Sequence, residues 1–269
     1  MTIWQAAVLG ALQGATEFLP ISSSGHLVLV PWLLGWEANS LFFGAAVHMG
    51  TLAAVLAYFR QDLWVMARAW VRTLRYRQVA DPYGRLAWLV IAGTIPAALA
   101  GVLLEDWFEA MFSSPLLVSV LLLVTGGFLA LAERLSRERK AAEQASLPDA
   151  VMVGLAQALA IAPGISRSGA TIAAGLGRGI NRAEAARFSF LLATPIIAGA
   201  GLLEVAQVTL AGDLPSLLLG LVGGLTAAAT GFVAIGALIR YLRQRSLLAF
   251  ACYCWAFGGL CLAIVLVRG

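Results

Sequence analysis

Two short polar segments interrupt apolar stretches of the sequence, and each carries residue types that suit anion binding. Residues 20–25 read Pro-Ile-Ser-Ser-Ser-Gly, and residues 163–169 read Pro-Gly-Ile-Ser-Arg-Ser-Gly. Glu17 lies just before the first segment, and Arg167 lies inside the second. Because the flanking stretches are apolar enough to lie in a membrane, where a charged side chain is costly unless paired or hydrated, we treat both residues as functional candidates.

The two segments have the features of a phosphate site. Helices that begin after them would offer unpaired backbone N–H groups, and Ser and Gly residues let a phosphate approach closely. Arg167 adds a planar, permanently charged guanidinium that suits phosphate oxygens. We therefore predict the following substrate-binding residues: Gln13, Ser22, Ser24, Gly25, Gly164, Ser166, Ser168, Gly169 and Thr171.

A carboxylate and a histidine next to a bound phosphate suggest phosphoryl transfer or hydrolysis. Glu17 could act as a base or metal ligand, and His26, which follows the first segment, could carry a proton. Simpler interpretations stay open: Glu17 and Arg167 could be an ion pair that only locks the fold, the serines could be helix caps, and His26 could be a satisfied interfacial histidine. His48 has no charged neighbour in the sequence, and we interpret it as structural.

The composition requires that a membrane surround these segments. Of 269 residues, 61% are hydrophobic and 12% are charged, with a mean hydropathy of +0.87, which excludes an ordinary soluble domain. We expect a single integral membrane domain, 1–269, and assign no chemistry to the three cysteines. Six stretches are long and apolar enough to cross a hydrocarbon core of roughly 30 Å: about 41–59, 86–104, 115–132, 188–205, 216–239 and 247–267.

The distribution of Lys and Arg indicates how the two interrupted regions, 3–35 and 150–176, lie in the membrane. If both enter and leave by the same face, four segments share one face and hold sixteen of the eighteen basic residues: 60–85, 133–149, 177–187 and 240–246. Basic loops are typical of the cytoplasmic face, so both termini are predicted to be periplasmic. The regions are then re-entrant helical hairpins, and the net charge of +4 reflects orientation rather than nucleic-acid binding.

The two interrupted regions also look like copies of one unit. A shift of 144 positions places Gln13 on Gln157 and residues 21–25 on residues 165–169. Three predicted crossings separate the copies, so they enter from opposite faces, as in an inverted repeat. We predict an all-α polytopic fold of six transmembrane helices plus two re-entrant hairpins, with repeats of about 1–132 and 150–269 and a cytoplasmic linker of about 133–149. Chance similarity among small residues at helix contacts is the alternative.

Two long motifs carry a resemblance to a known family. Residues 13–26 read Gln-Gly-Ala-Thr-Glu-Phe-Leu-Pro-Ile-Ser-Ser-Ser-Gly-His, and residues 163–171 read Pro-Gly-Ile-Ser-Arg-Ser-Gly-Ala-Thr. In these motifs, and in length and hydropathy profile, the chain closely resembles the undecaprenyl-diphosphatase family, bacterial enzymes also known as bacitracin-resistance proteins. The resemblance implies hydrolysis of undecaprenyl diphosphate to the monophosphate and inorganic phosphate, which recycles the lipid carrier of peptidoglycan synthesis at the bacterial cytoplasmic membrane.

The same resemblance implies roles for individual residues. Glu17 and Arg167 match the essential acidic and basic positions of the family, His26 the catalytic histidine, and Ser23 the candidate nucleophile or phosphate-binding hydroxyl. Members depend on Mg²⁺ or Ca²⁺, with Glu17 as the candidate metal ligand here. Gln13 replaces the first acidic position of the motif, so Glu17 is the only motif carboxylate. We expect Ser23 or a water to attack the phosphate while His26 moves the proton.

A transporter or flippase of an anionic prenyl phosphate lipid is the alternative function. Broken helices that meet in an inverted repeat are common in transporters. A carrier needs no nucleophile or proton carrier beside the anion, however, so the serines and His26 favour hydrolysis. The expected partners are the undecaprenyl diphosphate substrate and membrane lipids, without nucleic acid, and a homodimer is left open.

Overall fold

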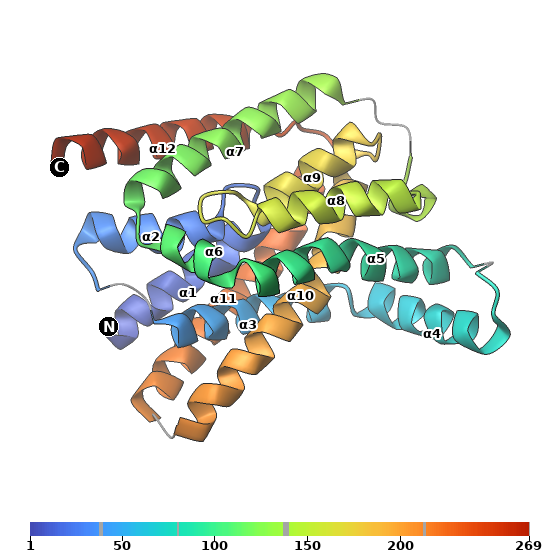
Figure 1. Ribbon diagram of the computed structural model, residues 1–269, viewed down its shortest axis with the longest axis horizontal. Helices are drawn as coiled ribbons and strands as arrows, with labels where there is room; N and C mark the ends of the chain where they lie inside the picture. Colours follow the sequence, from blue (N-terminus) through green and yellow to red (C-terminus); the bar gives the residue numbers. More distant parts are fainter. Residues whose placement is uncertain (38–39, 80, 137–139, 212–213, 269) are drawn as a thin grey trace.

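A computed structural model describes residues 1–37, 40–79, 81–136, 140–211 and 214–268 (Figure 1). The regular structure of these residues is helical apart from one isolated bridge between Lys140 and Ile180, as predicted for an all-α fold. The elements are, in order, α1 (Ile3–Phe18), α2 (Ser23–Leu34), α3 (Leu41–Tyr58), α4 (Arg60–Tyr76), α5 (Pro82–Leu103), α6 (Glu105–Phe112), α7 (Pro115–Leu135), the 3₁₀ turn η1 (Ala142–Gln144), α8 (Leu147–Leu159), α9 (Arg167–Gly177), α10 (Arg182–Ala211), α11 (Leu214–Leu242) and α12 (Leu248–Arg268).

Several helices are long and apolar enough to cross a membrane. Among the described residues, α5, α7, α11 and α12 meet that condition by length and composition. The pair α3 and α4 meets it only together, across a bend of 78°. These four or five helices confirm a multi-span membrane protein, although they do not establish the predicted number of six. The predicted span 188–205 lies within α10, and some of the side chains of this span fall outside the described part of the structure.

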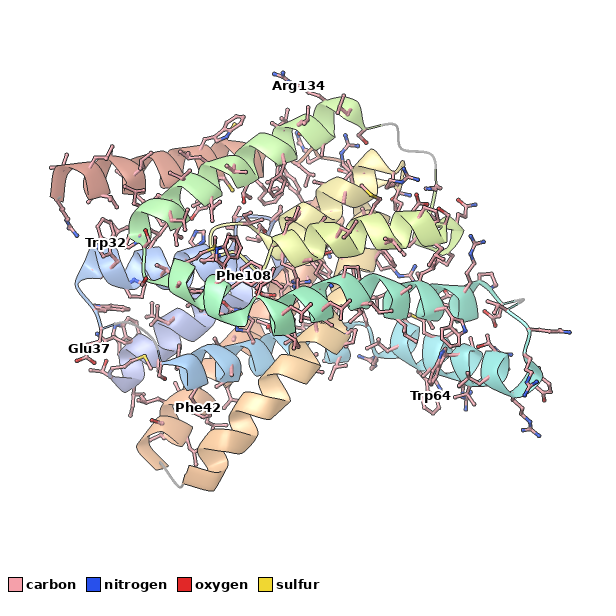
Figure 2. The ribbon with its side chains drawn as sticks, in the orientation of Figure 1. Trp32, Glu37, Phe42, Trp64, Phe108 and Arg134 are labelled. Atoms are coloured by element: carbon pink, nitrogen blue, oxygen red, sulfur yellow. The ribbon has the colours of Figure 1, made fainter. Side chains whose placement is uncertain are left out.

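The segment 60–85, predicted only as a basic connection, contains the helix α4. The arginines lower the mean hydropathy of this helix, so it does not stand out in the sequence as an apolar span. Its outer face also carries large apolar groups: Trp64 is 60% exposed, and the guanidinium of Arg68 lies 4.5 Å from the centre of its ring. Figure 2 shows Trp64 on the side of α4 that faces away from the other helices. An amphipathic helix of this kind is typical of a membrane surface.

The two interrupted regions form helical hairpins with matching local structure. The α1–α2 and α8–α9 hairpins open toward opposite ends of the molecule in Figure 1, and both chain termini lie at the end toward which α1–α2 opens. Thr2 and Ser146 begin the first helix of each hairpin with a capping box. Ser22 and Ser166 begin the second, and each hydroxyl accepts a hydrogen bond from the backbone N–H three residues later. These pairs repeat at the 144-residue spacing of the sequence motif.

Each hairpin packs closely against a long helix of the other half of the chain. Helix α1 lies against α11, and α8 lies against α5. A Cβ atom at Gly10 would stand 2.2 Å from the Gly223 carbonyl oxygen, and one at Gly154 would stand 2.3 Å from the Gly93 carbonyl oxygen. Since lipid supplies no hydrophobic force between helices, such backbone contact through small residues is what holds the hairpins in place.

A buried carboxylate ties the linker to the second hairpin. Asp149 is 0% exposed, and its carboxylate accepts hydrogen bonds from Lys140 Nζ at 2.5 Å, Arg178 Nε at 2.6 Å and the Ser146 backbone N–H at 2.8 Å. Burial alone would raise the pKa of Asp149, but these hydrogen bonds outweigh burial and hold the pKa well below its ordinary range.

We expect Asp149→Asn to lower the melting temperature at pH 7, by an amount equivalent to about 2 kcal/mol, because two cations lose their shared partner. A carboxylate with a lowered pKa stabilises the fold fully above its unfolded pKa, and this contribution is lost as the pH falls toward the folded value. The difference between wild type and variant should therefore shrink below about pH 4. Thermal unfolding in detergent at pH 7, 5 and 3 measures it. Asp81→Asn, at a carboxylate that bonds the exposed Arg72, is the control and should change little.

Candidate functional site

The two hairpins meet through an ion pair. Arg167 Nη2 lies 2.7 Å from Glu17 Oε1, and the exposed fractions of the two side chains are 14% and 5%. The tips of the hairpins also touch directly, because Ser168 Oγ donates a hydrogen bond to the Leu19 carbonyl at 3.2 Å. Opposite charges at this distance offset much of the cost that each would have alone in a membrane. The geometry thus brings together the two charged residues that the sequence singled out.

The second oxygen of the Glu17 carboxylate is surrounded by polar groups. Glu17 Oε2 accepts a hydrogen bond of 2.5 Å from Ser23 Oγ and one of 3.0 Å from Gln13 Nε2. His48 Nε2 lies 3.8 Å from the same oxygen. A short hydrogen bond from a hydroxyl to a carboxylate directs the hydroxyl proton toward a base. The contact therefore matches the predicted roles, in which Ser23 attacks the phosphate and a neighbouring carboxylate accepts its proton.

Arg167 is braced from its own side of the site. Its Nη1 donates to the Ser189 carbonyl at 3.3 Å, which connects α9 to α10. Thr171 reinforces the same contact, since its hydroxyl lies 2.6 Å from Ser189 Oγ and donates to the Arg167 carbonyl at 2.8 Å. Thr171 was predicted to bind substrate, but its hydroxyl is used in fixing the helix that carries the guanidinium.

A cavity of about 850 Å³ opens beside the ion pair. Its polar lining comprises Glu17, Ser23, Ser24, Ser40, His48, Ser113, Gln157 and Arg167. Large apolar residues make up much of the remaining wall: Leu27, Val28, Pro31, Trp32, Trp36, Phe112, Ile161, Ile165, Ile196 and Ile197. A few charged and polar groups in a mostly apolar cavity of this size suit a ligand with an anionic head and an apolar body.

Other predicted binding residues lie at the breaks without lining this cavity. Ser22 and Ser166 cap the helices that follow, and the backbone N–H groups of Gly25 and Gly169 donate to them at 3.2 and 3.0 Å. Those two N–H groups are thus occupied by the protein rather than open to a phosphate. Ser22 and Ser166 therefore act as helix caps, the alternative that the sequence left open for each serine. Ser23 and Ser24, by contrast, line the cavity.

Gly164 shapes the second break. It has a φ of +99°, and a Cβ there would meet the Val118 carbonyl oxygen at 2.4 Å, so the turn requires glycine. The Gly164 carbonyl accepts a hydrogen bond of 2.9 Å from Thr125 Oγ1, and that hydroxyl oxygen in turn accepts one of 3.2 Å from the Ser166 N–H. Helix α7 therefore holds the break open through one buried hydroxyl, which the sequence motif did not reveal.

The two histidines are placed differently from the sequence-based prediction. His26 Nδ1 donates to the Ser22 carbonyl at 2.7 Å, its Nε2 lies 2.7 Å from Tyr253 Oη, and its ring stacks on Phe257. It is 2% exposed and does not line the cavity. This geometry favours a satisfied histidine over a proton carrier, although the catalytic role itself stays a prediction.

His48, for which the sequence favoured a structural role, faces the site. Its Nδ1 donates to the Gly44 carbonyl at 2.7 Å, so the other ring nitrogen, Nε2, is the one that points to Glu17. In the sequence His48 has only apolar and small neighbours, which gave no sign of this contact. Glu17 lies on a different helix, and no regular spacing in the sequence connects residues 17 and 48.

The protein offers few ligands for a metal ion. In the described part of the chain, no three His, Cys, Asp or Glu side chains come together as a metal site. Among the described residues that line the cavity, Glu17 is the one carboxylate, and the amide of Gln13 lies beside it. A single carboxylate still suits Mg²⁺ when the substrate's phosphate oxygens and water complete the coordination, so Glu17 fits a cation that arrives with the substrate.

Comparison with known proteins identifies the family. A family model described as bacitracin resistance protein BacA matches residues 6–260. The chain belongs to the BacA family. A relative from Thermomicrobium roseum is 48% identical, covering 98% of this chain and 99% of its own length. One from Rubrobacter xylanophilus is 47% identical, covering 99% and 100%. Both relatives are named undecaprenyl-diphosphatase, which confirms the resemblance carried by the two motifs and gives no support to the transporter alternative.

Proposed function

We propose that this chain is a membrane phosphatase that hydrolyses undecaprenyl diphosphate to undecaprenyl phosphate and inorganic phosphate, and so recycles the lipid carrier of peptidoglycan synthesis. The observation that carries the proposal is the contact of Ser23, Glu17 and Arg167 in the lining of a mostly apolar cavity. The names of the full-length relatives support the same substrate and reaction. The family description names bacitracin resistance.

The cavity wall has charged and polar residues as well as large apolar ones, and each group binds a different part of the substrate. The terminal phosphate lies against Arg167, whose guanidinium neutralises charge on the phosphate oxygens. The prenyl chain extends along the apolar wall, where burial of its hydrocarbon favours binding. A hydrolase for this substrate has to work within the membrane, because its tail does not leave lipid.

The reaction proceeds by in-line attack on the terminal phosphorus. Ser23 Oγ forms the new bond to phosphorus as its proton passes to Glu17 Oε2, and the bridging P–O bond breaks to release prenyl phosphate. Water then displaces phosphate from Ser23 and restores both side chains. Direct attack by a water held at Glu17 needs the same base and the same guanidinium. Arg167 stabilises the charge in either case.

A divalent cation, Mg²⁺ or Ca²⁺, is proposed as the cofactor, held by Glu17 together with substrate oxygens. When bound, it would supply further neutralisation of charge on the phosphate groups.

The membrane arrangement that we propose has six transmembrane helices and two re-entrant hairpins, in the bacterial cytoplasmic membrane. The basic segments face the cytoplasm and both termini face the periplasm. The cavity lining includes Trp36, Ser40 and Ser113, in connections near the end of the molecule that holds the termini. Trp32, another lining residue, also lies toward that end in Figure 2. This supports access of the substrate from the periplasmic side.

We expect Glu17→Gln and Arg167→Lys to lower phosphate release at least 100-fold, because the first removes the proton acceptor and the second removes the planar fork. Initial rates on a prenyl diphosphate, with purified protein in detergent, measure the effect. Gel filtration and melting temperature identify variants that remain folded. Met152→Leu, on the exposed side of α8, is the control and should retain the wild-type rate. Near-normal release by folded Glu17→Gln or Arg167→Lys would exclude the proposed site.

The two histidines should differ in what their loss affects. His48→Asn is expected to lower kcat about tenfold, because His48 Nε2 faces Glu17 in the cavity. His26→Asn is expected to lower the melting temperature more than kcat, because its contacts are with Ser22, Tyr253 and Phe257. Measuring both quantities for both variants tests the assignment. The opposite pattern would restore His26 as the catalytic histidine.

Removal of divalent cations should abolish most of the phosphate release. The reason is that Glu17 and Arg167 alone face a substrate with several negative charges. Rates with a chelator, and after excess Mg²⁺ or Ca²⁺ is returned, provide the measurement. A rate that is unchanged in chelator would show that Arg167 suffices without a cation.

A further inference from the structure

Gln157, on α8, is a buried amide without a hydrogen-bond partner. It is 2% exposed, and neither Nε2 nor Oε1 has a partner among the described residues. It nevertheless lines the cavity that contains Glu17, Ser23 and Arg167. An amide buried without hydrogen bonds is costly, and such groups are rare unless a ligand or water satisfies them. The position of Gln157 therefore points to something that binds in the cavity.

Gln13, the counterpart of Gln157 in the first hairpin, does have a partner for its amide nitrogen. Gln13, 144 positions earlier, donates from Nε2 to Glu17, one helical turn further on. The corresponding position one turn after Gln157 is Ile161, an apolar residue that also lines the cavity. The second hairpin thus has the glutamine but lacks the glutamate that would accept a hydrogen bond from its Nε2.

The packing of α8 fixes the direction of this amide. Gly154, three residues earlier, allows the backbone of α8 to touch the Gly93 carbonyl of α5, which fixes the rotation of the helix. The opposite side of α8 carries Met152 and Leu155, which are 49% and 48% exposed. Gln157 therefore faces the interior, where it lines the same cavity as Arg167, Ile161 and Ile165.

We propose that Gln157 binds the lipid-side phosphoryl group of the diphosphate, through donation from Nε2 to a non-bridging oxygen. This inference rests on the proposed function and extends it to the second phosphate. In the proposed function Arg167 and Ser23 engage the terminal phosphate, so the lipid-side phosphate needs a further polar partner in the cavity. Among the described lining residues, Gln157 has two buried polar atoms without a hydrogen-bond partner. Oε1 accepts from a water or from a protonated phosphate oxygen. Gln157 thus contributes to binding of a diphosphate in preference to inorganic phosphate.

Gln157→Met tests this proposal, because it keeps length and removes both polar atoms. With full-length protein in detergent, KM for a prenyl diphosphate should rise about tenfold, the loss expected for one hydrogen bond to a charged group, while kcat changes less than about threefold. Inhibition by inorganic phosphate, which needs only the terminal site at Arg167, should be unchanged. A merely structural defect would weaken both, and Met152→Leu on the outer side of α8 should weaken neither.

Gln157→Glu gives a second measurement should the methionine variant fail to fold. It keeps the shape of the side chain and places a negative charge next to the lipid-side phosphate, so KM should rise about 100-fold or more, again with unchanged phosphate inhibition. A KM within about twofold of wild type for either folded variant would overturn the proposal, as would equal weakening of phosphate and diphosphate binding.

Binding of a non-hydrolysable prenyl methylenediphosphonate separates this proposal from the proposed function. If wild-type protein binds the analogue but releases no phosphate from the diphosphate, the hydrolase assignment fails, and weaker analogue binding by Gln157→Met still supports the role of Gln157. If wild type is active and Gln157→Met binds the analogue as wild type does, only the inference about Gln157 fails.

Discussion

The ion pair between Glu17 and Arg167 is the interaction on which the rest of the structure depends. Each charge would be expensive alone in a membrane, and the 2.7 Å contact offsets much of that cost only if the two hairpin tips stay together. The same contact places Ser23 against the other carboxylate oxygen. Stability and the proposed chemistry therefore share one geometry: the carboxylate that neutralises the guanidinium is also the proposed base for the serine.

Backbone proximity makes that contact possible. Gly10 and Gly154 let α1 and α8 approach α11 and α5 so closely that a methyl group would overlap a carbonyl oxygen. In lipid, where apolar side chains gain little by leaving their surroundings, such contacts and buried hydrogen bonds hold helices together. The hydrogen bond from Thr125 to the Gly164 carbonyl fixes the break between α8 and α9 in the same way. These contacts lie outside the cavity and fix the helices and the break that surround it.

Much of the site could be predicted from the sequence, because a charged residue within an apolar stretch must find a partner or water in the membrane. Glu17 and Arg167 each require a partner of this kind, so the sequence pairs them. His26 and His48 show where this reasoning ends: their roles depend on Tyr253 in one case and Glu17 in the other, residues that only the folded chain brings near. The serines look alike in sequence, yet Ser22 and Ser166 accept from backbone N–H groups, whereas Ser23, one position after Ser22, donates to Glu17. Hydropathy did not predict the helix α4, because its arginines offset its apolar face.

The two hairpins share a backbone plan but differ at the positions that matter for chemistry, and electrostatics explains why. At a spacing of 144 residues, Ser23 corresponds to Arg167, and Glu17 corresponds to Ile161. A strictly symmetric pair would bring either two glutamates or two arginines to adjoining tips, and like charges at that distance in a low dielectric raise the energy of the site. Divergence gives one hairpin Glu17 and Ser23, and the other the guanidinium of Arg167 and the amide of Gln157. The asymmetry therefore turns a two-fold arrangement of hairpin tips into one oriented site, as the proposed binding of an asymmetric lipid diphosphate requires.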